Sequence, residues 1–276
     1  MVYTATSIAA VARTGGAVRT LATLDDGPAR AIYDPVADDA RVYWIARTSD
    51  AIWSVPRRGG GAPRRLIAAP GHVLSALASD TGTLIYQEQT SGDAVAIVAI
   101  DTSGSHRRVL ADGLATPTRH VVVDRVVYYG AGSTVWAVAL AGGAPRPLAA
   151  ETATVTIDLW DPVQPDRVIG TREELAPITA VAVDDAAVYY SGPGGARRVA
   201  RTGGAPAVFP ARIPQPLAQD ATAWFTRDGA RLLRIAKIGG VPETLAVAAG
   251  PIGSLAVDGK TVYFNVGGVL LRLDLD

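Results

Sequence analysis

The segment VAVDDAAVYYSG, residues 181–192, decides the fold. It contains an apolar run, a turn with aspartate, and a second apolar run with an aromatic pair. The same order returns in VADDARVYWIA (36–46), VVVDRVVYYGA (121–131) and LAVDGKTVYFNVGG (255–268), and more loosely in LASDTGTLIYQ (77–87) and LAQDATAWFTRDG (217–229). Two short strands joined by a tight turn describe a β-hairpin, so the chain is predicted to repeat one unit based on a hairpin.

A third and a fourth strand are predicted after each hairpin. Segments such as AIWSVPRR (51–58), TVWAVALA (134–141) and LLRIAKI (232–238) have alternating character, and a Gly-Gly turn and a short last strand come next. Four short strands per unit and a period of about 40 residues are typical of a propeller blade. No stretch carries a helical period. We therefore predict an all-β fold, a single β-propeller domain over residues 1–276 with four-stranded antiparallel blades.

The spacing of the second-strand aromatics gives the number of blades. Successive positions lie 43, 42, 35 and 39 residues apart, but the interval from Tyr128 to Tyr189 is 61. That interval contains two strand-like segments, which we interpret as a truncated or irregular blade at residues 150–177. Counting it gives seven blades, and six is the alternative if these residues form an insertion. Residues 7–22 supply third and fourth strands and the C-terminus supplies three strands, so a composite blade from both termini is expected to close the ring.

Composition excludes several classes of protein. Lys and Arg total 26 of the 276 residues and Asp and Glu also total 26, so the overall charge does not favour nucleic acid as a partner. No apolar run is long enough to span a membrane, and the absence of cysteine excludes disulfides and thiolate chemistry. We expect a monomer. The N-terminal sequence lacks a secretory signal, so we expect a cytoplasmic protein, or a secreted or periplasmic one if a leader was removed.

The repeated motifs resemble a known kind of propeller. VYW at 42–44, VYY at 127–129 and 188–190, and VYF at 262–264 are similar to the repeats of YWTD propellers. With GGAPRPLA (142–149) and GGVPETLA (239–246), the chain more closely resembles bacterial repeats in which an AVD…VYW hairpin is followed by GGxP…LA. These repeats occur in secreted proteins of myxobacteria and other high-GC bacteria. The resemblance covers nearly the whole chain and implies a YWTD-like β-propeller.

Polar candidates for a site gather in the loops that lead into the first strand of each unit. In a propeller these loops surround the mouth of the central channel, where ligands are expected to bind. An acidic rim with a histidine can hold a divalent cation or stage acid–base chemistry, although turns also favour aspartate for structural reasons. The candidates in these loops are Asp26, His72, Asp112, Glu151, Glu173, Glu174 and Arg212.

Three further residues depart from the repeat. His120 starts a strand expected to line the channel, and Trp160 and Asp161 lie in the irregular unit, where the tryptophan could be a platform for a ligand. In contrast, the repeated hairpin aspartates are interpreted as structural turn residues that hydrogen-bond to the backbone. They are Asp39, Asp80, Asp124, Asp185, Asp220 and Asp258.

Two functions remain open from the sequence. The first is a non-catalytic propeller that binds a protein, a peptide or a small ligand at the channel mouth, without a cofactor. It is favoured because the repeat covers the chain and no nucleophile elbow, phosphate loop or metal-ligand spacing occurs in it. The alternative is a propeller enzyme, a metal-assisted hydrolase or lyase, which uses the loop carboxylates and a histidine with a divalent cation.

Overall fold

The structure is a computed structural model of the 276-residue chain. It describes residues 2–3, 7–10, 19–23, 32–46, 50–90, 92–160, 163–164, 166–209, 218–258, 260–266 and 269–275. All secondary structure in these residues consists of β-strands, as the sequence predicts. Within the described part of the chain, no helix is long and apolar enough to span a membrane.

Five blades have four strands each, hydrogen-bonded in chain order. Blade 1 consists of β4 (Ile32–Ala37), β5 (Arg41–Ala46), β6 (Ala51–Pro56) and β7 (Arg64–Ala68). Blade 2 consists of β8 (Val73–Asp80), β9 (Thr83–Gln89), β10 (Ala94–Asp101) and β11 (Arg108–Ala115). Blade 3 consists of β12 (Val121–Val123), β13 (Val126–Ala131), β14 (Thr134–Ala139) and β15 (Arg146–Ala150).

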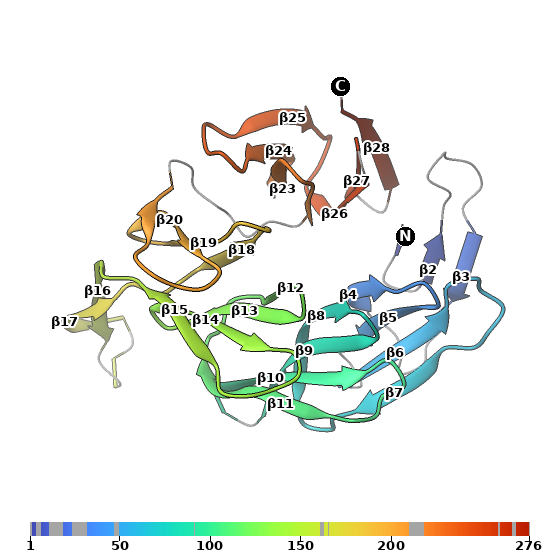
Figure 1. Ribbon diagram of the computed structural model, residues 1–276, viewed down its shortest axis with the longest axis horizontal. Coiled ribbons are helices and arrows are strands. Elements are labelled where there is room, and N and C mark those ends of the chain that lie inside the picture. The colour runs from blue at the N-terminus through green and yellow to red at the C-terminus, as the bar shows by residue number, and fades with distance from the viewer. Residues whose placement is uncertain are drawn as a thin grey trace.

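Blade 4 follows with β18 (Ala180–Val183), β19 (Ala187–Gly192), β20 (Gly195–Ala200) and β21 (Ala207–Val208). Blade 5 consists of β22 (Ala218–Gln219), β23 (Ala223–Asp228), β24 (Arg231–Ala236) and β25 (Glu243–Val247). Blade 6 has three strands, β26 (Ile252–Asp258), β27 (Thr261–Val266) and β28 (Val269–Asp274). The first strands of blades 1 to 4 contact one another in order, as do those of blades 5 and 6, so they form the inner ring of a propeller (Figure 1).

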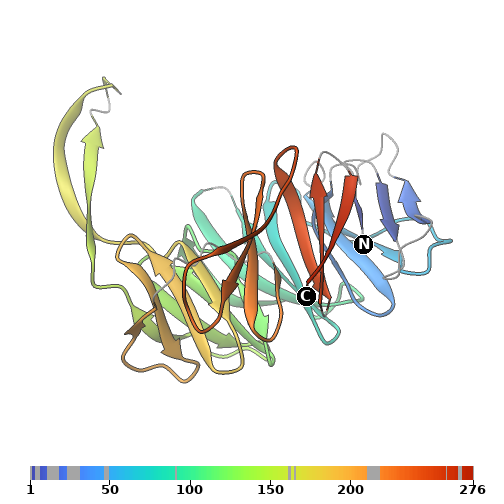
Figure 2. The same ribbon diagram turned by 90° about the horizontal axis from the view of Figure 1, so that it is seen from above.

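Over the described residues the propeller has six blades, and the seventh blade that we expected is not formed. Residues 150–177 provide only β16 (Thr154–Trp160) and β17 (Val168–Leu175), which pair with each other. These two strands, called the hairpin arm from here on, project from the ring (Figure 2). The six-blade alternative is therefore confirmed, because this segment is an insertion between blades 3 and 4.

The composite terminal blade is also not formed among the described residues. The N-terminal strands β1 (Val2–Tyr3), β2 (Ser7–Ala10) and β3 (Arg19–Thr23) make a three-stranded sheet of their own, separate from blade 6. The N-terminal sheet, which is not counted among the six blades, lies next to blade 6 in the view of Figure 1. The N-terminal segment forms its own first strand at residues 2–3, so the two ends do not share one sheet.

The Gly-Gly turns lie between the third and fourth strands. Gly142, Gly143, Gly203 and Gly204 have φ angles of 100°, 111°, 88° and 129°. Residues with a Cβ rarely adopt these positive φ angles, whereas glycine does so readily. The repeated glycine pair is thus a requirement of the backbone in this turn.

The aromatic pairs fill the interfaces between blades. Neighbouring strand residues point to opposite faces of a sheet, so Tyr128 packs in the cluster shared with blade 4 and Tyr129 packs in the cluster shared with blade 2. Tyr43 and Trp44 divide in the same way between blade 2 and the N-terminal sheet. In these blades the VY-aromatic motif therefore joins the blade to the sheets on both sides.

In blade 5 the aromatic pair lies one residue earlier on the second strand than the pair of blade 4 does. Phe225 packs toward blade 6, as Tyr189 packs toward blade 5, so these two residues hold equivalent positions. Trp224 consequently stands where blade 4 has Val188, and it points back toward blade 4. Because of this shift, equivalent positions in blades 4 and 5, Tyr189 and Phe225, lie 36 residues apart rather than the 35 between Tyr189 and Trp224.

Candidate functional site

In blades 1, 4 and 5 the turn between the first and second strands uses aspartate as a structural residue, as predicted, but in blades 1 and 4 this aspartate lies one position before the predicted one. Asp38 Oδ1 accepts hydrogen bonds from the backbone N–H groups of Ala40 and Arg41 at 2.8 and 2.7 Å. Asp184 Oδ1 accepts from Ala186 and Ala187 at 2.9 and 2.8 Å. Asp39 and Asp185, which the sequence repeat indicated for this role, are the exposed neighbours.

The turn aspartates also anchor a tyrosine five residues later. Tyr43 donates its hydroxyl hydrogen to Asp38 Oδ2 at 2.7 Å, and Tyr189 donates to Asp184 Oδ2 at 3.0 Å. Burial, followed by the hydrogen bond to Asp38, raises the pKa of Tyr43 to about 12. Burial and the charge of Asp184 likewise raise the pKa of Tyr189 to about 12. Both tyrosines are therefore neutral donors at physiological pH.

These bonds predict different effects for two adjacent aspartates. Asp184→Ala leaves two backbone N–H groups and the Tyr189 hydroxyl without their acceptor, and we expect a loss of about 1–3 kcal/mol in the free energy of unfolding. Asp185→Ala should change it by less than about 0.5 kcal/mol, because Asp185 is exposed. Urea denaturation of both variants measures the difference. Equal losses would contradict the assignment of Asp184 as the turn residue.

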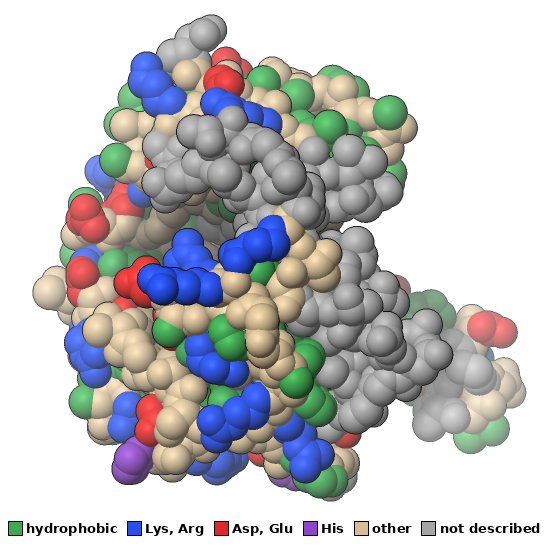
Figure 3. Space-filling view, turned by 90° about the vertical axis from the view of Figure 1, so that its right-hand side faces the viewer, with side chains coloured by type: hydrophobic (Ala, Val, Ile, Leu, Met, Phe, Trp, Pro, Cys, Tyr) green, Lys and Arg blue, Asp and Glu red, His purple; other side chains and the backbone are tan. Residues whose placement is uncertain are grey.

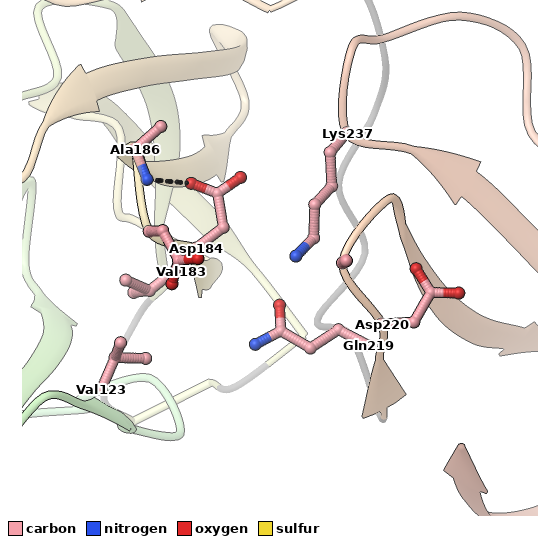
Figure 4. A pocket seen from close by; sticks show the side chains of 9 residues that line it. Val123, Val183, Asp184, Ala186, Gln219, Asp220 and Lys237 are labelled. Carbon is pink, nitrogen blue, oxygen red and sulfur yellow. Dashed lines mark hydrogen bonds between the residues drawn. The ribbon is translucent and has the colours of Figure 1, made fainter. Parts of the chain in front are cut away.

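A cavity of about 440 Å³ lies between blades 4 and 5, at the end of the ring where first strands turn into second strands. Asp184, Asp185 and Ala186 line it from the blade 4 turn, and Gln219, Asp220 and Ala221 from the blade 5 turn, with Val123, Val183 and Lys237 completing the wall. The ammonium group of Lys237 points into the space between Asp184 and Gln219 (Figure 4). We call this cavity the blade 4/5 pocket.

A comparison with the neighbouring blade interface explains why the blade 4/5 pocket is open. Arg201 directly follows the third strand of blade 4, and Lys237 directly follows the third strand of blade 5. Arg201 reaches across to blade 3, where its Nε donates to the Tyr128 hydroxyl at 2.9 Å and its Nη1 to Asp124 at 2.7 Å. The shorter, unforked side chain of Lys237 lies over the ring of Trp224 in its own blade, 5.9 Å from the centroid. Arginine thus closes one interface, whereas lysine leaves space at the next.

The polar groups of the blade 4/5 pocket differ in how many of their hydrogen bonds are already used. Asp220 Oδ1 accepts from the backbone N–H groups of Thr222 and Ala223 at 2.6 and 2.7 Å. Burial opposes ionisation of Asp220, but these bonds outweigh it and hold its pKa below the usual range. Gln219 Oε1 accepts from Trp224 Nε1 at 3.2 Å, which leaves the amide N–H groups of Gln219 to face the pocket. The pocket therefore presents amide and ammonium donors beside the carboxylates of the two turns.

Lys237 and Gln219 were missed by the sequence reasoning, although one signal was present. Lys237 and Lys260 are the only lysines among the 26 Lys and Arg residues. The lysine at this repeat position follows the shortened aromatic interval that marks Trp224. A substitution of lysine for arginine at an interblade position points to a local change in the repeat.

His72, one of the predicted rim residues, lies beside the buried carboxylate of Glu88. Its Nδ1 is 2.5 Å from Glu88 Oε1, and Arg107 donates to Glu88 Oε2 at 2.9 Å. Burial alone would raise the pKa of Glu88, but the hydrogen bonds from Arg107 and His72 lower it below its ordinary value. Glu88 is an acceptor for two fixed partners, so this group links the strands of blade 2.

His120 is buried between blades and does not face the channel. It alternates with Val122, which packs in the cluster shared by blades 2 and 3, and its ring is completely enclosed with neither nitrogen hydrogen-bonded in normal geometry. A backbone group of Ile85 approaches it from blade 2. Burial, followed by the charge of Arg119, lowers the pKa of His120 to about 4, so it is neutral at physiological pH.

Glu151 is also buried, at the base of the hairpin arm. Its Oε1 accepts from the backbone N–H groups of Thr152 and Ala153 at 2.9 and 3.1 Å, and its Oε2 lies 3.5 Å from Arg197 Nε. Tyr190 is nearby, and its pKa is raised by burial and by the charge of Glu151. The contacts of Glu151 hold the start of the hairpin arm against blade 4.

The other predicted site residues are not brought together in the described structure. Asp112 lies on the rim of an apolar groove of about 510 Å³ between β11 and blade 3, lined by Tyr129, Trp136 and Pro145 among others. Trp160, Glu173 and Glu174 lie on the hairpin arm, where Thr154 donates to Glu173 at 3.1 Å and Arg172 pairs with Glu174. Asp26, Asp161 and Arg212 lie outside the described residues. A common site for these residues at the channel mouth remains a prediction.

Charges on the outer face are mixed. On the side shown in Figure 3, Lys and Arg side chains lie among Asp and Glu side chains. Among exposed pairs, Arg57 lies 3.6 Å from Asp39, and Arg231 lies 2.8 Å from Asp228. Among the residues that the structure describes, no three His, Asp or Glu side chains form a group that could hold a metal ion.

Solved structures with the same fold include proteins of several functions. Virginiamycin B lyase from Staphylococcus aureus matches with a TM-score of 0.63 at 11% identity, over 94% of this chain and 84% of that one. BamB from Moraxella catarrhalis matches with a TM-score of 0.52 at 17% identity, over 99% and 81%. A puromycin-hydrolyzing peptidase from Mycobacterium tuberculosis matches with a TM-score of 0.62 at 18% identity, over 94% of this chain but only 46% of the peptidase.

These likenesses establish the class of protein. The chain is a β-propeller repeat protein, and identities this low show the fold alone. No family model matches the sequence. No curated protein matches it either.

Proposed function

We propose that this protein is a non-catalytic propeller that binds a small zwitterionic ligand, such as a short peptide, in the blade 4/5 pocket. The observation that carries the proposal is the open interblade space with Lys237 pointing into it. A role as a binding scaffold agrees with the fold. The solved structures with the same fold include a lyase and a peptidase as well as BamB. The proposed site differs from the channel mouth expected from the sequence, because it lies at the opposite end of the blades.

Charges of both signs on the pocket wall support a zwitterion. The Lys237 ammonium and the Gln219 amide supply donors for a ligand carboxylate, while exposed Asp185 supplies an acceptor for a ligand ammonium. The carboxylates of Asp184 and Asp220 already hold turn amides, so they contribute mainly negative potential. A cavity of about 440 Å³ falls within the usual range of about 300–1,000 Å³ for small-ligand sites.

Three forms of one dipeptide test this assignment. We expect free alanyl-alanine to bind more tightly than its C-terminal amide, which lacks the carboxylate for Lys237, and more tightly than its N-acetyl form, which lacks the ammonium for Asp185. A hydrogen bond to a charged group contributes about 1.5–3 kcal/mol, so each change should weaken binding roughly 10- to 100-fold. Titrations followed by NMR chemical shifts measure the three dissociation constants.

Two substitutions at one position make the controls. Lys237→Met should weaken the free dipeptide to the level of the amide without weakening the amide further. Lys237→Arg keeps the charge, but we expect its guanidinium to fill the pocket, as Arg201 fills the preceding interface, and to abolish binding. If all three dipeptide forms bind equally, or none binds at millimolar concentration, the proposal is wrong.

The same titration tests the enzyme alternative. A hydrolase would convert free alanyl-alanine to alanine, and the product signals would appear in the spectra with time. Addition of a divalent cation to the same samples extends the test to metal-assisted chemistry. We propose a binding protein, without a cofactor, because the blade 4/5 pocket contains no histidine and two of its three aspartates, Asp184 and Asp220, are engaged in turns.

The repeats themselves are proposed to be of the YWTD-like bacterial kind. The support is the packing of the VY-aromatic motifs of blades 1 and 3 against the sheets on both sides, and the Gly-Gly turn before the last strand. In such a repeat, ligand specificity comes from positions that depart from the pattern. Trp224 and Lys237 are two such positions.

A further inference from the structure

The hairpin arm carries apolar side chains on a pair of strands that has no other sheet to pack against. Ile157 and Leu159 are each 37% exposed, and Trp160 is 54% exposed. On β17, Val168 and Ile169 are 43% and 56% exposed. An isolated two-stranded hairpin is only marginally stable in water, and a third or fourth strand normally stabilises it. The hairpin arm is therefore a surface that gains stability when another strand is added.

The two edges of the hairpin arm differ in charge. Along β17, Arg172, Glu173 and Glu174 are three consecutive charged residues, a pattern that discourages strand addition. Along β16, Asp158 is the only charged residue, and proline and lysine are absent. Among the described strands β16 pairs only with β17, so its outer edge presents unpaired backbone groups. Strand addition is thus expected at β16.

The sequence of β16 is complementary to itself in an antiparallel arrangement. If Ile157 of one copy lies opposite Ile157 of another, Val155 lies opposite Leu159, and Thr156 lies opposite Asp158. The first pairs are apolar on one face, and the last joins a hydroxyl donor to a carboxylate on the other face. Such cross-strand pairs stabilise a sheet, whereas a shift that opposes the two Asp158 side chains is unfavourable.

We propose that the hairpin arm is a dimerisation element, in which β16 of two copies of this chain pair antiparallel about Ile157. The result is a continuous four-stranded sheet in the order β17-β16-β16-β17, with a two-fold axis through the Ile157 pair. The arm projects from the ring (Figure 2). The apolar stripe of Val155, Ile157 and Leu159 then continues across both copies.

The register is tested by single cysteine substitutions, because the chain has no cysteine of its own. Directly opposite antiparallel residues have Cα atoms about 4.5–5.5 Å apart, which is within the range for a disulfide of about 4.4–6.8 Å. Ile157→Cys is therefore expected to form a covalent dimer under mild oxidation. Leu159→Cys is the matched control, because its two thiols would be offset by four residues, roughly 14 Å along the strand, and should not cross-link.

Sedimentation equilibrium tests the assembly itself. We expect the unmodified chain to be a dimer at micromolar concentration. Ile157→Lys places two ammonium groups opposite each other and should weaken dimerisation roughly tenfold or more, whereas Ile169→Lys on β17 should leave it unchanged. Circular dichroism of each variant confirms that the blades are folded. A monomeric unmodified chain, or faster cross-linking of the Leu159→Cys variant than of the Ile157→Cys variant, would overturn the proposal.

Discussion

Trp224→Ala is expected to lower the free energy of unfolding by about 3–5 kcal/mol, the range for removing a large aromatic side chain from a core. Trp224 is completely buried and makes edge-to-face contacts with Tyr189 and Phe209, with centroids 4.6 and 5.8 Å away. Its indole N–H also fixes Gln219 at the wall of the blade 4/5 pocket. The variant should therefore lose dipeptide binding together with stability.

Trp160→Ala is the matched control for this prediction. It makes the same change on the hairpin arm, where the side chain is 54% exposed, and should alter the stability of the blades by less than about 0.5 kcal/mol. Differential scanning calorimetry of the three proteins measures both effects. Similar melting temperatures for the Trp224→Ala variant and the unmodified chain would show that the blade 4/5 interface does not depend on this ring.

The features that could be predicted from the sequence are those set within one blade. The hairpin turn, the aromatic pair and the Gly-Gly turn depend on residues fewer than ten positions apart, and the structure contains them where the repeat places them. The distinction between Asp184 and Asp185 was missed, because two adjacent aspartates satisfy the same turn pattern. Only the hydrogen bonds to Ala186 and Ala187 separate them.

The number of blades could not be predicted from the local sequence, because it depends on packing between segments far apart in the chain. β16 and β17 pair through seven residue positions, as the first two strands of a blade would. Whether such a hairpin joins the ring is decided by packing against neighbouring blades, and most positions of both strands remain exposed. The same limit applies to the site. The blade 4/5 pocket exists because Lys237 and Arg201, in different blades, have side chains of different length and shape.

Because His120 is buried in its neutral form, we expect the folded protein to lose stability on acidification. Its pKa is lowered from 6.5 to about 4 in the folded protein, mainly by burial and then by the charge of Arg119. The unfolded chain therefore binds a proton at higher pH than the folded chain does. The contribution of neutral His120 is complete above pH 6.5 and is lost as the pH falls toward 4, a change of about 3 kcal/mol, because one pKa unit corresponds to about 1.4 kcal/mol.

The charges around His120 explain why the protonated form is not accommodated. Arg119 pairs with Asp34 on β4 at 2.6 Å, so the carboxylate nearest to His120 is already engaged by a guanidinium. Asp34 offsets only part of the penalty. His120→Leu removes the titrating group and the two nitrogens without normal hydrogen bonds. Between about pH 6.5 and pH 4, the free energy of unfolding of this variant should fall by about 3 kcal/mol less than that of the unmodified chain.

Urea denaturation at a series of pH values measures this difference. His106→Gln provides the control, because His106 is 83% exposed and lies in an outer turn of blade 2, and the loss of stability through this range should persist in that variant. The carboxylates with lowered pKa values, including Glu88, Asp38 and Asp220, contribute stability that is lost only below their ordinary range. A loss of stability between pH 6.5 and pH 4 that remains unchanged in the His120→Leu variant would contradict the burial of a neutral imidazole between blades 2 and 3.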